Sequence, residues 1–514
     1  MYISRMEDEM ENMLRSNTPM PGFKELQAHF ANQYRQVFND KMAHKTIVIL
    51  PGISLDKDIL SKVTGVLHYE ERMLCMLMLL RFPNTHVVYM TSIPIDPVII
   101  DYYIHMLPGI TGYHARKRLT LLSCFDASRK SLTEKILERP RLIEQIRKCI
   151  PDKRFAHLSA FNVTNAEKEL ALQLGIPLYG CDPDLLLIGT KSNCRKIFRE
   201  CGVPLPDGLE DLYSEEDIIN ALVTLKKNNP STEKAVIKIN DGFSGEGNSM
   251  FSFKDAPEEN ELQDWIKKQL PRTLKIVAAN VPYPIYLEKF NALGGIVEVF
   301  IDGENKCSPS VQCRINPLGV IDIISTHDQI LGGECGQVFL GAIFPANTAY
   351  AKELGEIGKK ISEKLKQEGV LGRFSIDFIS VQKEGKWIHY AIEINLRKGG
   401  TTHPYLMLQF LTNGHYDAVN GMYFTANGQP RYYVCSDNFQ SPLYQGLTPY
   451  DLIDIATCND ILYNGTSQEG VMFHMISALS QYGKMGLVCI GSTMERAKEF
   501  YTRAEEIFND HKNR

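Results

Sequence analysis

The sequence has little excess charge, no long apolar run and no closely paired cysteines. Its 56 basic and 61 acidic side chains leave a net charge of −5, which argues against a generic nucleic-acid-binding protein. The strongest apolar run, residues 73–80, is far too short to cross a membrane, and we interpret it as a buried helix. The 12 cysteines include no CxxC pair, so neither a zinc site nor an exported disulfide framework is indicated. We expect reduced thiols in a cytoplasmic protein, and the acidic start lacks the apolar core of a secretory signal.

Length and composition favour a multidomain globular protein. A chain of 514 residues can bury two or three large cores, and 44% hydrophobic with 23% charged residues is typical of folded proteins. Residues 1–44 are polar and helical in pattern. From 45 to 188, strand patterns at 46–50, 86–91, 119–123 and 154–159 alternate with helical patterns such as 131–148 and 165–174, which predicts a parallel, helix-covered sheet. No GxGxxG follows the first strand, so a dinucleotide site is unsupported.

A glycine-rich loop joins two predicted strands, 234–239 and 249–253. A Walker loop would be followed by a helix, so we interpret this loop as a flap whose backbone amides approach phosphates closely. Lys238 stands at its root, placed to meet the same phosphates. The alternative is an ordinary mobile loop. The loop residues with this expected role are Gly242, Ser244, Gly245 and Gly247.

Lys191 lies in the first turn of a helix predicted over 189–201. The helix dipole disfavours a cation there, so this placement favours an anion nearby. The alternative is a lysine that points into solvent.

Residues 371–404 are predicted to form a β-hairpin with its turn at 383–386. A turn centred on Gly385 sets Ile376 opposite Ile394 and Phe378 opposite Ile392, so that the apolar face closes on itself. The same register sets Asp377 directly opposite Glu393.

Like charges directly opposite each other repel, so something must offset that cost. A divalent cation would do so, and the carboxylates of Asp377 and Glu393 with the amide oxygen of Asn395 are the ligand types that magnesium prefers. Arg397, further along the same face, could donate two hydrogen bonds from its guanidinium to a phosphate group. The alternative is a solvated polar face. On this hypothesis Glu393→Ala keeps the fold, because relief of repulsion offsets the lost ligand.

The remaining patterns carry weaker signals. Residues 285–290 are predicted as a short apolar strand that carries Glu288 and Lys289, and the strand 308–315 carries Gln312 and Arg314 on one face. Further elements are expected as follows: a strand at 295–301, helices at 351–368 and 405–412, a turn-rich stretch at 441–458, strand or helix at 470–480, a strand at 487–490 and a helix at 494–508.

The order of these pieces resembles the ATP-grasp superfamily: a helix-opening lysine, a strand lysine, a glycine flap, an acidic hinge strand, and then Asp and Glu-x-Asn on paired strands. The resemblance covers roughly residues 190–405, and the three-part arrangement is most similar to pheganomycin-type peptide ligases. It implies a mixed α/β and α+β protein. The implied domains are a helical leader (1–44), a parallel α/β pre-ATP-grasp domain (45–188), a two-lobed ATP-grasp domain (189–429, flap lobe about 205–285) and a C-terminal α+β extension (430–514).

The resemblance also implies roles for residues. Lys191 and Lys238 match the lysines that contact nucleotide phosphates, and residues 241–248 match the flap. Glu288 with the following Lys289 and Phe290 matches the hinge that reads the adenine edge.

Asp377, Glu393 and Asn395 match the magnesium ligands, with manganese as an alternative ion. Arg397 matches the arginine near the transferred phosphoryl and acyl groups, and Arg314 has a looser phosphate or substrate role. One departure is that the first ligand is Asp where the family more often has Glu.

The implied activity is an ATP-dependent carboxylate–amine ligase that acts through an acyl phosphate on an amino acid or peptide, with no nucleic-acid or membrane partner. The alternatives are an ATP-grasp kinase for a small molecule and a non-catalytic nucleotide sensor. The sequence leaves open both substrates and whether the chain forms a homodimer.

Overall fold

The computed structural model describes most of the chain. No described helix is long and apolar enough to cross a lipid bilayer. The described cysteines are free thiols. The described residues are 22–38, 40–54, 60, 63–241, 247–278, 281–332 and 338–510.

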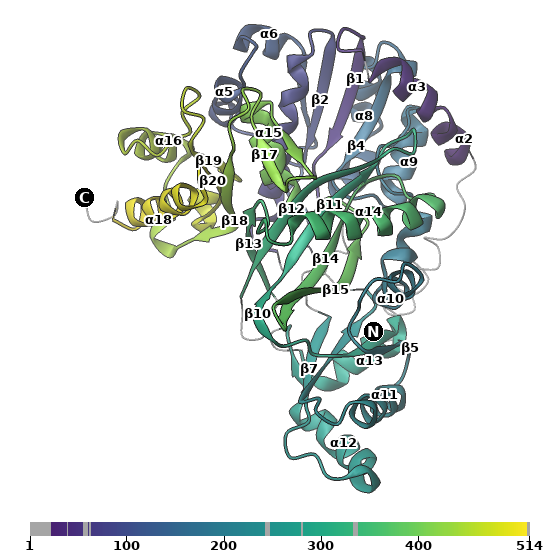
Figure 1. Ribbon diagram of the computed structural model, residues 1–514. Helices are drawn as coiled ribbons and strands as arrows, with labels where there is room; N and C mark the ends of the chain where they lie inside the picture. Colours follow the sequence, from purple (N-terminus) through teal and green to yellow (C-terminus); the bar gives the residue numbers. More distant parts are fainter. Residues whose placement is uncertain are drawn as a thin grey trace.

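A four-stranded parallel sheet of order β3-β2-β1-β4 forms the N-terminal part, as the alternating pattern predicts (Figure 1). Alternate residues of β1 enter two cores: Ile47 and Ile49 pack on one face, and Val48 and Leu50 on the other. The elements are α2 (Phe23–Ala28), α3 (Phe30–Val37), β1 (Lys45–Leu50), the 3-10 helix η1 (Val66–Arg81), β2 (Thr85–Thr91), α5 (Pro97–Met106), α6 (Gly112–Lys117), β3 (Leu119–Ser123), α7 (Leu132–Leu137), α8 (Pro140–Lys148), η2 (Lys153–Phe155), β4 (Ala156–Ala160) and α9 (Asn165–Leu174).

Two details of this part differ from the sequence-based expectation. The helix predicted over 131–148 is two helices, because Pro140 cannot continue a helix from the preceding turn and instead starts α8. The buried run 73–80 is helical but belongs to the longer η1.

A second sheet of order β5-β9-β6-β7-β8 forms a small lobe with its helices, at the bottom of Figure 1. The predicted strand at 285–290 is wrong, because these residues belong to helix α13. Tyr286 and Phe290 lie one helical turn apart, and both enter the core of the lobe. This packing stabilises a helix in a short apolar run whose pattern suggested a strand. The elements are β5 (Gly208–Leu212), α11 (Glu215–Asn228), β6 (Lys234–Ile239), β7 (Asn248–Ser252), α12 (Glu259–Thr273), β8 (Lys275–Ile276), α13 (Tyr283–Leu293) and β9 (Gly295–Val299).

The large central sheet has nine strands, in the order β10-β14-β11-β12-β13-β18-β20-β19 with β15 beside β14. Its last three strands, β18, β20 and β19, come from the C-terminal part of the chain, so that part continues the central sheet. The elements before residue 400 are η3 (Pro183–Gly189), α10 (Lys191–Glu200), β10 (Glu304–Cys307), β11 (Pro309–Ile315), β12 (Ile321–Gly332), β13 (Val338–Phe344), α14 (Ala351–Gln367), β14 (Gly372–Lys383) and β15 (Lys386–Asn395).

The hairpin of β14 and β15 has the predicted register at its functional end. Ile376 pairs with Ile394 and Asp377 with Glu393. A β-bulge follows, so Phe378 pairs with Ala391 and the predicted partner Ile392 is wrong. The extra residue reverses the faces nearer the turn, where Ala391 is buried in the core and Ile392 lines a cavity.

The C-terminal part packs on the N-terminal one (Figure 1). The ambiguous segment 470–480 begins as a strand and then turns into a short helix. The elements are α15 (Thr402–Thr412), β16 (His415–Asp417), β17 (Met422–Phe424), β18 (Tyr432–Gln440), η4 (Pro442–Tyr444), α16 (Pro449–Cys458), β19 (Gly470–His474), α17 (Ala478–Tyr482), β20 (Lys484–Gly491) and α18 (Met494–Asp510).

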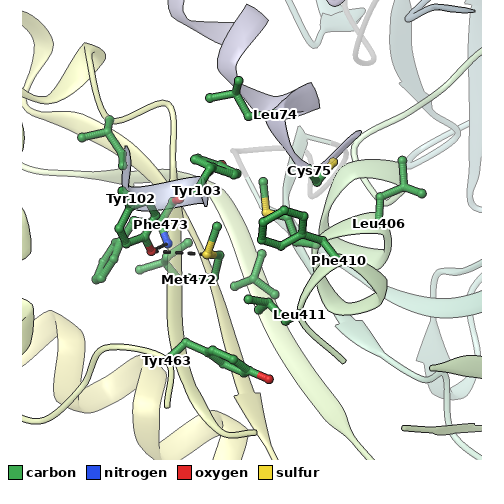
Figure 2. Close-up of a cluster of buried hydrophobic side chains, with 14 of the residues drawn as sticks. Leu74, Cys75, Tyr102, Tyr103, Leu406, Phe410, Leu411, Tyr463, Met472 and Phe473 are labelled. Carbon is green, nitrogen blue, oxygen red and sulfur yellow. Dashed lines mark hydrogen bonds between the residues drawn. The ribbon is translucent and has the colours of Figure 1, made fainter. Parts of the chain in front are cut away.

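Figure 2 shows the core that joins these two parts, in which side chains of η1 and α5 pack with side chains of α15 and β19. Tyr102 crosses the junction: its hydroxyl oxygen accepts from the backbone N–H of Phe473 at 3.0 Å. The N-terminal part is therefore held in place over the central sheet, and η1 can contribute side chains to a shared cavity.

Candidate functional site

A cavity of about 850 Å³ lies between the small lobe, the central sheet, η1 and the C-terminal strands. This volume is in the usual range for small-molecule sites. Both sheets direct charged residues into it: Lys238 and Glu298 from the small lobe, and Asp377 and Glu393 from the hairpin.

The predicted metal ligands come together at the wall formed by the hairpin. Asp377 accepts hydrogen bonds from the amides of Asn395 and Gln329, each at 3.0 Å. Glu393 stands on the facing strand, and its Oε1 accepts from Lys191 Nζ at 2.7 Å. Asp377, Glu393 and Asn395 all line the cavity and carry hard oxygen atoms, so this donor set fits magnesium.

The two opposed carboxylates have different electrostatic surroundings. Burial, and then the facing charge of Glu393, raise the pKa of Asp377 to about 7. Burial also acts to raise the pKa of Glu393, but the adjacent ammonium of Lys191 outweighs it and leaves that pKa below its usual value. Near neutral pH the pair therefore carries less than two full negative charges, as expected where repulsion between like charges is only partly offset.

Both predicted phosphate-binding lysines line the cavity, and each is paired with a carboxylate. Burial acts to lower the pKa of Lys191, yet Glu393 outweighs it and the pKa is raised. Lys238 donates to Glu298 Oε1, and Glu298 Oε2 accepts from Arg195 at 3.1 Å. Lys191 thus reaches the cavity from the start of helix α10 and Lys238 from strand β6 of the small lobe, and each is paired with a carboxylate.

Arg397 follows the end of β15 and lines the cavity near the carboxylate pair. Burial lowers its pKa, and the charges of Glu393 and Asp377 oppose that effect. In the flap, Gly247 lines the cavity, whereas Gly242, Ser244 and Gly245 lie outside the described residues.

The predicted adenine hinge lies in the wrong place. Glu288 and Lys289 are exposed on helix α13, Phe290 is buried in the lobe's core, and none of the three lines the cavity. The cavity wall is instead formed by the end of β9 and the residues after it, Glu298, Val299, Phe300 and Ile301. The signal available in the sequence was the single carboxylate inside the apolar segment 295–301.

Arg314 does not reach the cavity. It forms two hydrogen bonds with Asp322 on the neighbouring strand, at 2.7 and 2.9 Å. Ser310 is the residue of β11 that pairs with Asp377, so Arg314 lies four residues, roughly 13 Å, further along the strand. Gln312 is also turned away, with its amide bonded to the Thr401 carbonyl at 2.7 Å.

Sequence reasoning also missed the end of the cavity away from the small lobe. It is lined by Tyr69 and Arg72 of η1 and by Asp437, Asn438 and Lys484 of the C-terminal strands. These residues are far apart in the sequence, so no local motif connects them.

A nucleotide-sized cavity between a small antiparallel lobe and a larger sheet, lined by two lysines and a carboxylate pair, is the arrangement expected for the ATP-grasp fold. Residues 185–279 and 259–419 match the family described as IQCH-like, ATP-grasp, and residues 451–504 match the PGM1 C-terminal domain. Residues 185–419 of the chain therefore match an ATP-grasp domain.

The L-propargylglycine–L-glutamate ligase of Streptantibioticus cattleyicolor is 27% identical over 472 residues, which cover 90% of this chain and 93% of the relative. Two solved structures share the fold. The biotin carboxylase domain of Hydrogenobacter thermophilus 2-oxoglutarate carboxylase, a complex with MgADP, ADP and bicarbonate, has a TM-score of 0.52 at 14% identity and covers 90% of this chain and 89% of that one. The ADP complex of an N5-carboxyaminoimidazole ribonucleotide synthetase has a TM-score of 0.51 at 13% identity and covers 92% and 99%.

Proposed function

We propose that the protein is an ATP-dependent carboxylate–amine ligase that activates a carboxylate as an acyl phosphate and transfers the acyl group to an amine. The observation that carries this proposal is the opposed pair Asp377 and Glu393, set beside Arg397 in a cavity that two lysines also line. The relative that this chain resembles over most of its length is a ligase that joins two amino acids.

ATP would lie with its base against the small lobe. Val299, Phe300 and Ile301 give that end of the cavity an apolar wall suited to a flat ring, and the polar side chains lie further in. On binding, Lys191 and Lys238 would exchange Glu393 and Glu298 for phosphate oxygens, so their charges remain paired throughout.

The chemistry then depends on positioning and charge. The substrate carboxylate attacks the γ-phosphoryl group, ADP leaves, the amine attacks the acyl phosphate, and phosphate leaves as the amide forms. Arg397, which lines the cavity, would stabilise the oxyanion of the second step, and the two lysines would draw charge from the phosphoryl group in the first. Magnesium held by Asp377, Glu393 and Asn395 would neutralise charge on the phosphates.

The division of the chain at residues 44, 188 and 429, the cytoplasmic location and a homodimer are further parts of this proposal. The free thiols of the described cysteines support a reducing compartment.

The test is to incubate the protein with ATP, magnesium and mixtures of amino acids, and to follow ADP together with new amides by mass spectrometry. Asp377→Asn should abolish amide formation. Asp322→Asn, the same change at a half-exposed carboxylate outside the cavity, should not.

Three outcomes separate the alternatives. Amide formation that depends on Asp377 supports the ligase. ADP with a phosphorylated small molecule and no amide would make the protein a kinase. Nucleotide binding without turnover in any mixture would make it a sensor.

A further inference from the structure

The cavity continues past the carboxylate hairpin to an end that the catalytic proposal leaves unused. We call this the distal end and define it by Tyr69, Arg72, Asp437, Asn438 and Lys484. It combines a helix from the N-terminal part with two strands from the C-terminal part. The charges and hydrogen bonds of these side chains indicate which chemical group of a substrate the distal end can bind.

Arg72 is held in one orientation but its hydrogen bonds are incomplete. The guanidinium lies between the rings of Tyr69 and Phe161, 4.4 and 4.7 Å from their centroids. Its Nη1 donates to Asp437 Oδ2 at 3.1 Å, whereas Nη2 is buried and has no hydrogen-bond partner in the described part of the chain. A buried donor of a charged group without a partner is costly, so this edge is suited to an acceptor from a ligand.

Asp437 is already committed to three donors within the protein. Its Oδ1 accepts from the Nε2 atoms of His403 and His474, at 2.7 and 2.8 Å, and its Oδ2 accepts from Arg72. A metal ion is a poor alternative at this cluster. Binding at the two Nε2 atoms would put a proton on each Nδ1, and both Nδ1 atoms are buried with no partner among the described residues. The cluster therefore anchors Arg72.

Lys484 adds a positive charge that the described residues do not balance. It is 5% exposed and lines the cavity, and its Nζ donates to the Tyr69 hydroxyl at 2.9 Å. No carboxylate of the described chain forms an ion pair with it. Since Asp437 balances Arg72, the distal end keeps one net positive charge, and a buried cation favours an anionic partner.

We propose that the distal end binds the α-carboxylate of the amine substrate, so that the acceptor is a free amino acid. This inference rests on the proposed ligase function. Arg72 and Lys484 line the cavity from η1 and β20, outside the small lobe against which the nucleotide base would lie, so an acceptor bound there would approach the acyl phosphate from the side away from the nucleotide. Asn438 lines the same end of the cavity, and its side-chain amide would form a hydrogen bond with another part of the acceptor.

The first test needs no turnover. The full-length protein, with a non-hydrolysable ATP analogue and magnesium, is titrated with each of the twenty L-amino acids and with the matching α-carboxamides, and the thermal midpoint is recorded. At least one amino acid should raise the midpoint, and its carboxamide at the same concentration should not.

Variants then assign the effect to Lys484. Lys484→Met should weaken binding of that amino acid by about tenfold or more, since it removes a charge-assisted hydrogen bond, and Lys484→Arg should retain most of it. The matched control is Lys383→Met. Lys383 also donates to a tyrosine hydroxyl, that of Tyr390 at 3.2 Å, but is exposed and lies outside the cavity.

The outcomes separate the two proposals. Equal binding of acid and carboxamide, unchanged binding in Lys484→Met, or no binding of any amino acid overturns the distal site. This holds even if Lys484→Met does not fold, because the wild-type comparison stands alone. Acid-selective binding without amide formation would keep the site and refute the ligase. Equal turnover of acid and carboxamide would do the reverse.

Discussion

The ion pair between Lys191 and Glu393 leads to a prediction opposite to the one drawn from the sequence. On the sequence alone, Glu393→Ala relieves carboxylate repulsion and leaves the fold intact. In the structure, Glu393 is the partner of Lys191, which is 7% exposed, at 2.7 Å. Removing one member of a fully buried pair typically costs about 3–5 kcal/mol. The Glu393 side chain is 27% exposed, so we expect the lower end of that range or somewhat less, which still exceeds the benefit of about 1 kcal/mol or less from relieving the repulsion with Asp377. We therefore expect nucleotide-free Glu393→Ala to be clearly destabilised.

Two further variants isolate the cause. Glu393→Gln keeps an acceptor oxygen for Lys191 and should lose less, about 1–3 kcal/mol. The double variant Lys191→Met, Glu393→Gln removes both charges and should return to within about 1 kcal/mol of the parent, because apolar replacement of a whole buried pair is often neutral.

The assay can be made local to the hairpin. The chain has two tryptophans, and Trp387 lies on β15, the strand that carries Glu393. In a Trp265→Phe background, urea unfolding followed by fluorescence reports on Trp387 alone. A Glu393→Ala midpoint equal to the parent would refute the ion-pair argument, and a double variant as unstable as Glu393→Ala would show that the loss is not electrostatic.

Three other expectations concern single substitutions. Burial raises the pKa of Glu70 to about 7, so its contribution to stability is present below its unfolded pKa and is lost as pH rises through about 7. Between pH 5 and pH 8, the unfolding free energy of the wild type measured in urea should therefore fall by up to about 3 kcal/mol relative to that of Glu70→Gln. The same pH dependence in both proteins would contradict this. Gly486→Ala should reduce the unfolding free energy by about 1–3 kcal/mol, and so lower the thermal midpoint, because its Cβ would lie 2.0 Å from His474 Nε2. Gly465→Ala, whose Cβ would meet no atom within 4 Å, is its control, and equal midpoints would show that the ring moves aside freely. Arg314→Ala should keep ADP formation, and it should lose about 1 kcal/mol or less of stability because its ion pair with Asp322 is partly exposed. Loss of ADP formation would show that Arg314 acts in the active site.

The hairpin could be predicted because its determinants are local. Alternating apolar residues and a two-residue turn with positive φ at Glu384 and Gly385 fix which residues face each other, so the pairing of Asp377 with Glu393 followed from the sequence. The bulge at Ile392 did not, because nothing in the alternation marks the extra residue; packing of Ala391 and Trp387 into the core selects it.

Failures concentrate where tertiary packing decides. Residues 285–290 form a short apolar run that suggests a strand, yet Tyr286 and Phe290 enter the core of the small lobe from a helix, and the residues predicted as the adenine hinge lie outside the cavity. Arg314 lies on the predicted strand, but it is too far along that strand to reach the cavity. The distal end was out of reach, since Arg72 and Asp437 are 365 residues apart.

One consequence of the charge arrangement extends beyond single residues. In the structure, Glu393 accepts a hydrogen bond from Lys191, and Glu298 accepts from both Lys238 and Arg195. A triphosphate must take both lysines from these carboxylates. Glu393 then needs a new cation, which magnesium would supply, whereas Glu298 keeps Arg195. Nucleotide without magnesium would leave Glu393 uncompensated beside Asp377, so the two should bind cooperatively, and the coupling should depend on Glu393 much more than on Glu298.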